Sequence, residues 1–192
     1  MHNLKHPLIL GSQSPRRKQI LKDAGFEFTC LSPDVEETYP EHLKEAGIPV
    51  YLAEKKAQKV IEMMDEPSII LTSDTIVWHR ESALNKPQNE LEAIDMLISL
   101  SDSAHYVHTG VCVLFENEKI SFSETTEVKF QKLSSEIINY YVNKFKPLDK
   151  AGAYGIQEWI GMIGVEKING SFYNVMGLPI HRVFSVLMKF CQ

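Results

Sequence analysis

Cysteine is scarce in this sequence. The 192 residues include three cysteines, Cys30, Cys112 and Cys191, which are far apart and form no Cys-x-x-Cys pair. A disulfide framework or a zinc site needs paired or closely spaced thiols, so neither is expected to hold the fold together. The pattern is typical of a reduced, cytoplasmic chain whose cysteines are buried as small hydrophobic residues.

Long apolar runs are also missing. Near the N-terminus only Pro7 to Leu10 are consecutively apolar, which is too short for a signal peptide or a membrane span. No other segment approaches the length of apolar sequence that a membrane helix needs. We therefore expect no membrane partner.

Basic charge is in deficit. Twenty Lys and Arg residues stand against twenty-five Asp and Glu residues, which gives a net charge of -5. Such a chain lacks the broad basic surface that binds nucleic-acid polymers or anionic membranes. The charge balance favours a small-molecule partner and argues against a nucleic-acid polymer.

Several catalytic and binding motifs are absent. The sequence has no G-x-x-x-x-G-K-[ST], G-x-G-x-x-G, G-x-S-x-G or H-E-x-x-H pattern. His105 and His108 are three residues apart in a predicted strand, so their side chains should face opposite sides of the sheet. We expect these histidines to be structural or exposed, and not a metal-ligand pair.

What is present is the composition of an ordinary globular protein, with 44% hydrophobic and 23% charged residues. A chain of this length can bury roughly 70% of the surface of the unfolded chain. Because no repeat or linker divides it, we expect a single domain over residues 1–192, or two closely packed lobes.

Helical and strand patterns alternate along the chain, which predicts an α/β fold with a mixed central sheet flanked by helices. The predicted strands are Leu8–Leu10, Phe26–Leu31, Ile69–Trp78, the hairpin His105–Phe115 and Lys119–Phe130, and the tail strands Ala153–Ile156, Ile163–Ile168 and Phe172–Val175. The predicted helices run from Pro15 to about Ala24, from Pro49 toward Pro67, and over Asn89–Leu100, Ser135–Phe145 and Pro179–Phe190. We expect a tight Asn169-Gly170 turn between two of the tail strands.

The first turn between a strand and a helix has the chemistry of a phosphate site. Ser12, Ser14, Arg16 and Arg17 would place hydroxyls, free backbone N–H groups, a helix N-terminus and two guanidinium groups together. Arginine suits phosphate because its planar fork donates two parallel hydrogen bonds. The alternative is a capped surface helix with a solvated basic first turn; arginine opposes the helix dipole there, which favours the phosphate site.

Asp74 lies among three hydroxyl residues in a strand that is otherwise expected to be buried. An unpaired buried carboxylate costs several kcal/mol, so Asp74 should have a cation or a metal ion as its partner. The alternative, with equal weight from this residue alone, is hydrogen bonding to the hydroxyls of Thr72, Ser73 or Thr75. Lys86 follows the same strand and offers a nearby cation.

A second carboxylate could come from Glu36 or Glu37 in the acidic stretch that follows the second strand. Mg²⁺ prefers one or two carboxylates together with substrate phosphates. Lys55 and Lys56 point about 100° apart on a helix, so at most one easily faces a site. Lys56 adjoins the apolar stripe and is the better candidate.

Taken together, these segments resemble the Maf family of nucleotide pyrophosphatases. The segments that carry the resemblance are Ser12-Gln13-Ser14-Pro15-Arg16-Arg17, Glu36-Glu37, Leu52-Ala53-Glu54-Lys55-Lys56-Ala57, Ser73-Asp74-Thr75-Ile76-Val77, Asn85-Lys86-Pro87, His108-Thr109-Gly110-Val111, Asp149 to Gln157 and Asn174 to Pro179. They occur in the family's order over almost the whole chain.

The resemblance implies an elongated, two-lobed fold like that of inosine triphosphate pyrophosphatases, with a nucleotide cleft, and a homodimer. It also implies hydrolysis of a nucleoside triphosphate between its α and β phosphates, with Mg²⁺ or Mn²⁺ as cofactor. The segment that ends at Gln157 is similar to the branch acting on dTTP and UTP, with modified pyrimidine nucleotides as further candidates. The role would be the removal of unwanted nucleotides from the cellular pool.

By position, the resemblance makes Asp74 the catalytic carboxylate and Glu37 the acidic residue that binds the metal with it. Ser12, Arg16, Arg17, Lys56 and Lys86 match groups that bind the phosphates. Arg16, Thr75 and Gln157 match positions associated with specificity. The segment Glu158-Trp159-Ile160 departs from the pattern, because it is bulkier than the expected glycine-containing segment.

Two other functions fit parts of this pattern. A nucleotidyltransferase is suggested by the hydroxyl-rich turn, but Ile76 occupies the position of the second aspartate of an Asp-x-Asp pair. A non-catalytic nucleotide-binding regulator is suggested by the family's link by name to septum formation. Retention of both Glu37 and Asp74 favours catalysis over binding alone.

Overall fold

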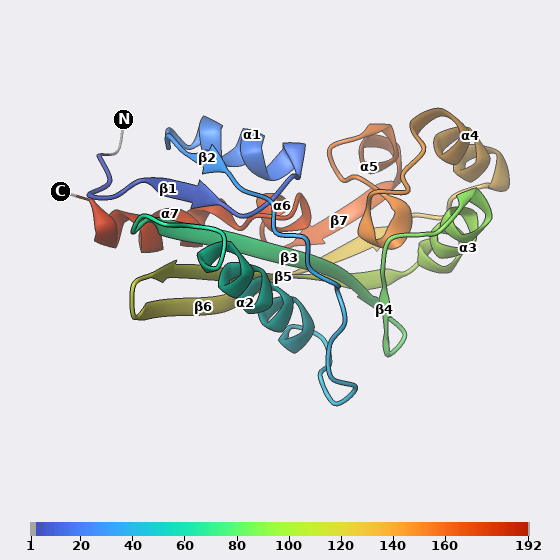
Figure 1. The fold of residues 1–192 in the computed structure, drawn as a ribbon. Coiled ribbons are helices and arrows are strands. Elements are labelled where there is room, and N and C mark those ends of the chain that lie inside the picture. Colours follow the sequence, from blue (N-terminus) through green and yellow to red (C-terminus); the bar gives the residue numbers. More distant parts are fainter. Residues whose placement is uncertain (1–2, 192) are drawn as a thin grey trace. The chain divides into compact units, whose positions relative to one another are not determined.

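A computed structural model describes residues 3–191 and shows a mixed α/β fold (Figure 1). The strands pair in the order β2-β1-β3-β5-β6-β7, and β4 pairs with β3. The strands are β1 Leu8–Leu10, β2 Thr29–Cys30, β3 Ile69–His79, β4 Ser82–Leu84, β5 Ala104–Phe115, β6 Glu118–Phe130 and β7 Val165–Asn169. The helices are α1 Pro15–Asp23, α2 Gly47–Ile61, α3 Glu90–Leu100, α4 Ser135–Phe145, α5 Trp159–Gly164, α6 Phe172–Val175 and α7 Ile180–Leu187, with short 3₁₀ turns η1 Ala151–Ala153 and η2 Met188–Phe190.

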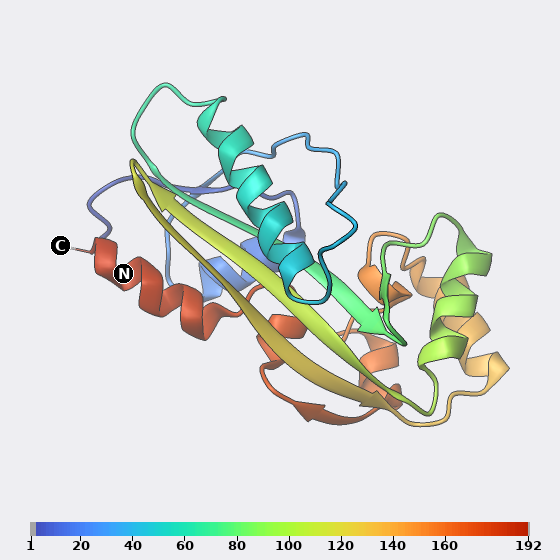
Figure 2. The same cartoon turned by 90° about the horizontal axis from the view of Figure 1, so that it is seen from below.

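The sheet is mixed, as the sequence predicts. Strand β1 is parallel to both β2 and β3, whereas β4 is antiparallel to β3 and β7 is antiparallel to β6. Strands β5 and β6 form the predicted hairpin, two long strands joined by a tight turn (Figure 2). Among residues 3–191, no helix has the length and apolar character needed to cross a membrane.

The chain forms two compact units, and neither is continuous in sequence. The first contains the residues up to Asp74, then Thr109–Glu124 and the residues from Gly177 onward. The second contains Thr75–His108 and Thr125–Met176. Strands β3, β5 and β6 contribute residues to both units.

The first unit is built on β1 and the first half of β3. Ile69, Ile70 and Leu71 are buried and lie in parallel register with Leu8–Leu10. A continuous apolar run of this kind is typical of a strand covered on both faces. Figure 1 shows α1 and α2 on opposite sides of these strands, and Ala53 and other small residues of α2 pack in one cluster with Ile70.

Local signals place both ends of α1. Ser14 is the N-cap, with its hydroxyl accepting from the backbone N–H of Arg17, and Pro15 occupies the first turn. Gly25 follows the helix with a φ of 84°, a conformation that favours glycine. The prediction for this helix is confirmed.

Helix α2 begins two residues before the predicted Pro49, and it lies close against β5. A Cβ on Gly110 would lie 2.2 Å from both the carbonyl carbon of Pro49 and the backbone nitrogen of Val50. No side chain fits in that space, so a glycine at this point of β5 is required by the approach of the α2 backbone.

The second unit has its own hydrophobic core. Tyr141 of α4, Phe130 of β6 and Leu97 of α3 are fully buried in it. Asn89 and Ser134 cap α3 and α4 by accepting backbone N–H groups of the first turns, close to where the sequence predicts these helices to begin.

The predicted tail strands are mostly wrong. Ala153–Ile156 follows a 3₁₀ turn in which Gly152 and Ala153 have positive φ, and Phe172–Val175 is the helix α6, which begins because Ser171 caps it. The third segment is shifted, because α5 extends to Gly164 and β7 follows it. Short apolar runs do not distinguish strand from helix, and capping decides here.

Three smaller predictions also need correction. The second strand is limited to Thr29–Cys30, and the Asn169-Gly170 turn connects β7 with α6 instead of joining two strands. The cysteines are all free, but only Cys112 is buried; Cys30 is exposed on the short edge strand.

The histidines of β5 are structural. His105 and His108 are both buried, and they bind different partners: His105 Nε2 lies 2.7 Å from the Tyr154 hydroxyl, and His108 Nδ1 lies 2.8 Å from the Thr125 hydroxyl. Burial, with a smaller contribution from His79, lowers the pKa of His105 to about 3. His105 is therefore neutral in the folded protein over the physiological range.

This lowered pKa predicts acid sensitivity. Between pH 6.5 and about 3 the unfolded chain binds a proton at His105 that the folded chain does not, so stability falls as the pH falls through this window, by at most about 1.4 kcal/mol per pH unit. We expect His105→Gln to reduce that slope in urea unfolding measured from pH 7.5 to 4.5. The exposed His181→Gln serves as control, and equal slopes for wild type and His105→Gln would contradict the prediction.

Candidate active site

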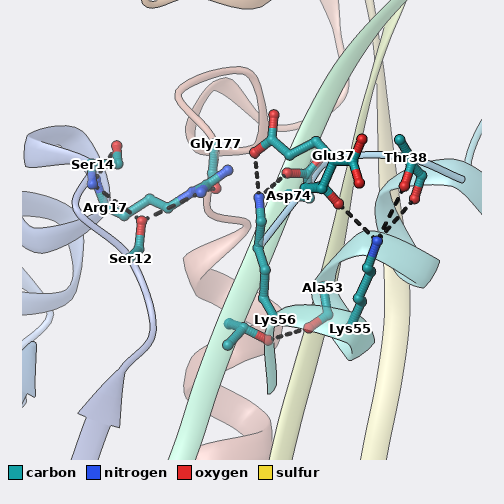
Figure 3. Close-up of polar contacts among 12 residues, drawn as sticks. Ser12, Ser14, Arg17, Glu37, Thr38, Ala53, Lys55, Lys56, Asp74 and Gly177 are labelled. Carbon is teal, nitrogen blue, oxygen red and sulfur yellow. Dashed lines mark hydrogen bonds and ion pairs between the residues drawn. The ribbon is translucent and has the colours of Figure 1, made fainter. Parts of the chain in front are cut away.

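The turn between β1 and α1 is organised by two serine hydroxyls (Figure 3). Ser12 is buried, and its Oγ accepts from the backbone N–H of Ser14 at 3.2 Å and from Arg17 Nη1 at 3.4 Å. Ser14 Oγ accepts from the backbone N–H of Arg17 at 3.4 Å. These hydrogen bonds stabilise the connection between β1 and α1. Arg16 and Arg17 follow it in the first turn of the helix.

Arg17 joins this turn to the segment before α7. Its Nε donates to the Gly177 carbonyl at 2.8 Å, and the Ser73 hydroxyl of β3 donates to the same oxygen at 3.3 Å. Burial lowers the pKa of Arg17, while attraction to Asp74 and, more weakly, to Glu37 raises it. The guanidinium is therefore within electrostatic reach of both carboxylates and remains charged.

Asp74 is buried on β3, and its partner is a cation. Lys56 of α2 donates to Asp74 Oδ1 at 2.5 Å and to Glu37 Oε1 at 2.7 Å (Figure 3). The neighbouring hydroxyls of Thr72 and Ser73 donate to the carbonyls of Ala53 and Gly177. The sequence left two alternatives for the partner of Asp74, a cation or the neighbouring hydroxyls. In the structure Asp74 pairs with a cation, the ammonium group of Lys56.

The adjacent Lys55 binds different groups. Its Nζ donates to the Glu36 carbonyl at 2.8 Å and lies within 3.4 Å of both oxygens of Thr38 (Figure 3). Lys55 therefore holds the backbone on either side of Glu37, while Lys56 binds the Glu37 carboxylate. Sequence reasoning considered these lysines only as alternatives for one site and missed this division.

The structure brings six of the predicted site residues into the first unit as one polar cluster: Ser12, Ser14, Arg17, Glu37, Lys56 and Asp74. Arg16 follows in the first turn of α1. Sequence reasoning gave Gly177 no role, although it lies in the segment Asn174 to Pro179, and it considered Thr72 only as an alternative partner of Asp74, whereas Thr72 donates to the Ala53 carbonyl. The carbonyl of Gly177 is a hydrogen-bond acceptor, a role that residue type does not reveal.

Three further predicted residues belong to the second unit. Thr75 directly follows Asp74 on β3, and Lys86 is exposed after β4. Gln157 is exposed and lines a pocket of about 400 Å³. The other lining residues are almost all apolar: Ile156, Gly161, Met162, Val165, Ile168 and Phe172.

The two carboxylates fit a hard divalent cation. Within residues 3–191 no group of three or more His, Cys, Asp or Glu side chains gathers at one point. Glu37 and Asp74 nevertheless both reach one ammonium, so their oxygens surround a position that a cation already occupies. Mg²⁺ takes such a pair of carboxylates when water and substrate phosphates complete its coordination.

A family profile described as "Maf-like protein" matches residues 7–190. The chain belongs to the Maf family. The resemblance inferred from the motifs is therefore confirmed, and this Maf chain matches the family over nearly its whole length.

Curated relatives agree with this membership. The chain is 47% identical over 193 aligned residues to a protein of Parabacteroides distasonis named dTTP/UTP pyrophosphatase, covering 99% of this chain and all of the relative. Proteins with the same name from Cytophaga hutchinsonii and Phocaeicola vulgatus are 50% and 48% identical, covering 98% and 96% of this chain and 85% and 96% of the relatives.

Among solved structures, this Maf chain is similar to a HAM1 protein from Coxiella burnetii, with a TM-score of 0.53 at 13% identity. The likeness covers 96% of this chain and 99% of the other chain. At this identity it concerns the fold alone, and it confirms the predicted fold class of a mixed sheet flanked by helices.

The Lys56 and Asp74 pair should be strongly coupled in stability. Lys56→Met leaves a buried carboxylate without its closest cation, and we expect a cost of about 3 kcal/mol. In a double-mutant cycle with Asp74→Asn, we expect a coupling on the order of 1 to 3 kcal/mol, measured by urea unfolding. The exposed Lys129 and Glu166 pair should couple far less, and strict additivity at Lys56 and Asp74 would refute the pairing.

Proposed function

We propose that this Maf chain hydrolyses dTTP and UTP between the α and β phosphates, releasing the nucleoside monophosphate and pyrophosphate. The main support for this proposal is the buried Asp74 carboxylate. It pairs with Lys56, which also binds Glu37, and it interacts electrostatically with Arg17. The names of relatives at 47% to 50% identity support the substrate class.

The first unit supplies groups for the triphosphate. Ser12 and Ser14 lie at the N-terminus of α1, where backbone N–H groups and the helix dipole attract anions. Arg16 and Arg17 add guanidinium groups that bind phosphate oxygens in pairs. Lys56 and Lys86 complete the proposed set of phosphate-binding cations.

Asp74 is the proposed general base. It orients the attacking water and accepts its proton while the water oxygen forms a bond to the α phosphorus. The bond from the α phosphorus to the bridging oxygen breaks, and pyrophosphate leaves with the electron pair. Positive side chains around the triphosphate stabilise the charge that builds up on the leaving group.

Glu37 and Asp74 are the residues that would hold Mg²⁺ or Mn²⁺. When bound, the cation neutralises negative charge on the triphosphate. Lys56 Nζ donates to the same two carboxylates, so its ammonium group offsets part of their negative charge.

The second unit offers a place for the pyrimidine base. The pocket of about 400 Å³ falls within the range of small-ligand sites, roughly 300 to 1,000 Å³. Its apolar lining suits the faces of a planar ring, and the Gln157 amide carries one donor and one acceptor group for the ring's polar edge. We assign pyrimidine specificity to Gln157, with Arg16 and Thr75 as further contributors.

The resemblance and the composition also support a homodimer in the cytoplasm. Light scattering of the purified chain tests the dimer. The nucleotide-binding regulator and the nucleotidyltransferase remain distinguishable by turnover in ¹⁸O water, since hydrolysis alone places the solvent oxygen on the product monophosphate.

Loss of the Asp74 carboxylate should abolish turnover. We expect Asp74→Asn to lower kcat for dTTP and UTP by about 10² to 10⁴ because the general base is lost. The assay is pyrophosphate release with Mg²⁺ from a panel of nucleoside triphosphates, with folding checked by circular dichroism. Asp95→Asn, which neutralises an exposed carboxylate on α3, is the control, and full activity of a folded Asp74→Asn would refute the assignment.

Gln157→Ala should weaken base discrimination. Removing one donor and one acceptor from the base site should lower kcat/KM for dTTP and UTP about tenfold to a hundredfold, with a smaller effect on purine nucleotides. Steady-state kinetics over the same panel measure this change. Gln88→Ala, at an exposed glutamine of the same unit, is the control, and an unchanged base preference in Gln157→Ala would exclude the role.

A further inference from the structure

Glu158 directly follows Gln157 and makes a partly buried polar network in the second unit. One carboxylate oxygen, Oε2, accepts a short hydrogen bond from the Tyr141 hydroxyl. The other, Oε1, lies 3.2 Å from Lys150 Nζ. Tyr141 is fully buried, Lys150 is nearly so and the Glu158 side chain is 21% exposed, so the network is partly shielded from solvent and is not a surface ion pair.

The same network forms hydrogen bonds with the turn that contains Gln157. The Tyr141 hydroxyl accepts from the backbone N–H of Gly155 at 3.1 Å, and the backbone N–H of Glu158 donates to the Gly155 carbonyl at 3.0 Å. Both polar groups of the Gly155 backbone therefore end on Glu158 or on its partner. The turn from Gly155 to Gln157 is held at its start and at its end.

Close packing adds to these hydrogen bonds. A Cβ on Gly155 would lie 2.7 Å from Glu158 Cδ, so the carboxylate rests directly on the glycine backbone. A Cβ on Gly161 would lie 1.9 Å from the Ile156 carbonyl oxygen, which brings α5 against the other side of the turn. Because Gly155 and Gly161 have no side chains, Glu158 and α5 can both pack directly against the turn.

Glu158 has both a neutral donor and a cation as partners. Burial and the neighbouring Glu158 raise the pKa of Tyr141, so its hydroxyl stays protonated and donates to the carboxylate. Lys150 neutralises Glu158 and also binds Asp149 at 2.6 Å. Together, the contacts with Tyr141 and Lys150 favour one position of the Glu158 carboxylate.

Gln157 itself is exposed at the apolar pocket. The backbone of the turn fixes the point from which the Gln157 side chain extends and restricts the rotamers that it can adopt. The direction of the Gln157 amide therefore depends on the turn, and the turn depends on Glu158.

We propose that Glu158 is a positioning residue for base recognition: through Tyr141 and Lys150 it holds the Gly155–Gln157 turn so that the Gln157 amide faces the pyrimidine. This inference rests on the proposed function and adds a second, indirect determinant of pyrimidine selectivity. Glu158 touches neither the phosphates nor the reacting atoms in this assignment.

The test compares Glu158→Ala, Tyr141→Phe and Glu158→Gln in kinetics with dTTP, UTP and dGTP. The first two variants lose a hydrogen bond of the network, and we expect KM for dTTP and UTP to rise about tenfold, with the preference over dGTP falling about tenfold and kcat changing far less. Glu158→Gln keeps an acceptor for Tyr141, so we expect it to retain most of the selectivity.

Asp95→Asn is the control, because it removes an exposed carboxylate of the same unit, on α3, that has no part in this network. We expect its selectivity to equal that of the wild type. If Glu158→Ala does not fold, Glu158→Asp carries the test, since it keeps the charge but withdraws the carboxylate from Tyr141, and the same loss of selectivity is expected.

Two failures can be told apart. If the wild type releases pyrophosphate from dTTP and UTP but Glu158→Ala and Tyr141→Phe lose thermal stability or kcat with unchanged selectivity, the positioning role is overturned and the proposed function stands. If the wild type hydrolyses neither nucleotide, the proposed function is wrong, and this inference, which rests on it, is wrong as well.

Discussion

The burial of one carboxylate on a central strand is the constraint on which the first unit depends. Asp74 lies in an almost entirely buried strand, and an ionised carboxylate there is tolerated only with a cation and hydrogen bonds around it. Lys56 meets that need from α2, and it also binds Glu37 from the preceding loop. One ammonium group therefore ties a strand, a helix and a loop to a single point.

Neighbouring contacts strengthen the same arrangement. Thr72 donates to the Ala53 carbonyl and so fixes α2 beside β3 at the level of Lys56. Arg17 and Ser73 share the Gly177 carbonyl, which brings the start of α1 and the segment before α7 to the same strand. The polar groups are thus placed by the same hydrogen bonds that join the elements, so the site needs little rearrangement of the backbone to present its charges.

The two units divide the proposed chemistry. The first holds the serine turn, the arginines, Lys56 and both carboxylates, which are the groups suited to a triphosphate and its cation. The second unit contains Gln157 beside an apolar pocket, on a turn that the Glu158 network stabilises. In the proposed function, different parts of the chain therefore neutralise charge and recognise the base, and each part has its own polar network.

The sequence alone determined the elements that depend on neighbours three or four residues away. Ser14, Asn89 and Ser134 cap helices that begin close to the predicted positions, and the run from Ile69 forms the expected buried strand. The motifs, read in order, also identified the family. Tertiary structure decided what depends on residues distant in sequence: which of Lys55 and Lys56 meets Asp74, why Gly110 must lack a side chain, and how Tyr141 reaches the turn before Gln157. Local hydrogen bonds are encoded by spacing, whereas these contacts exist only after the strands and helices have packed together.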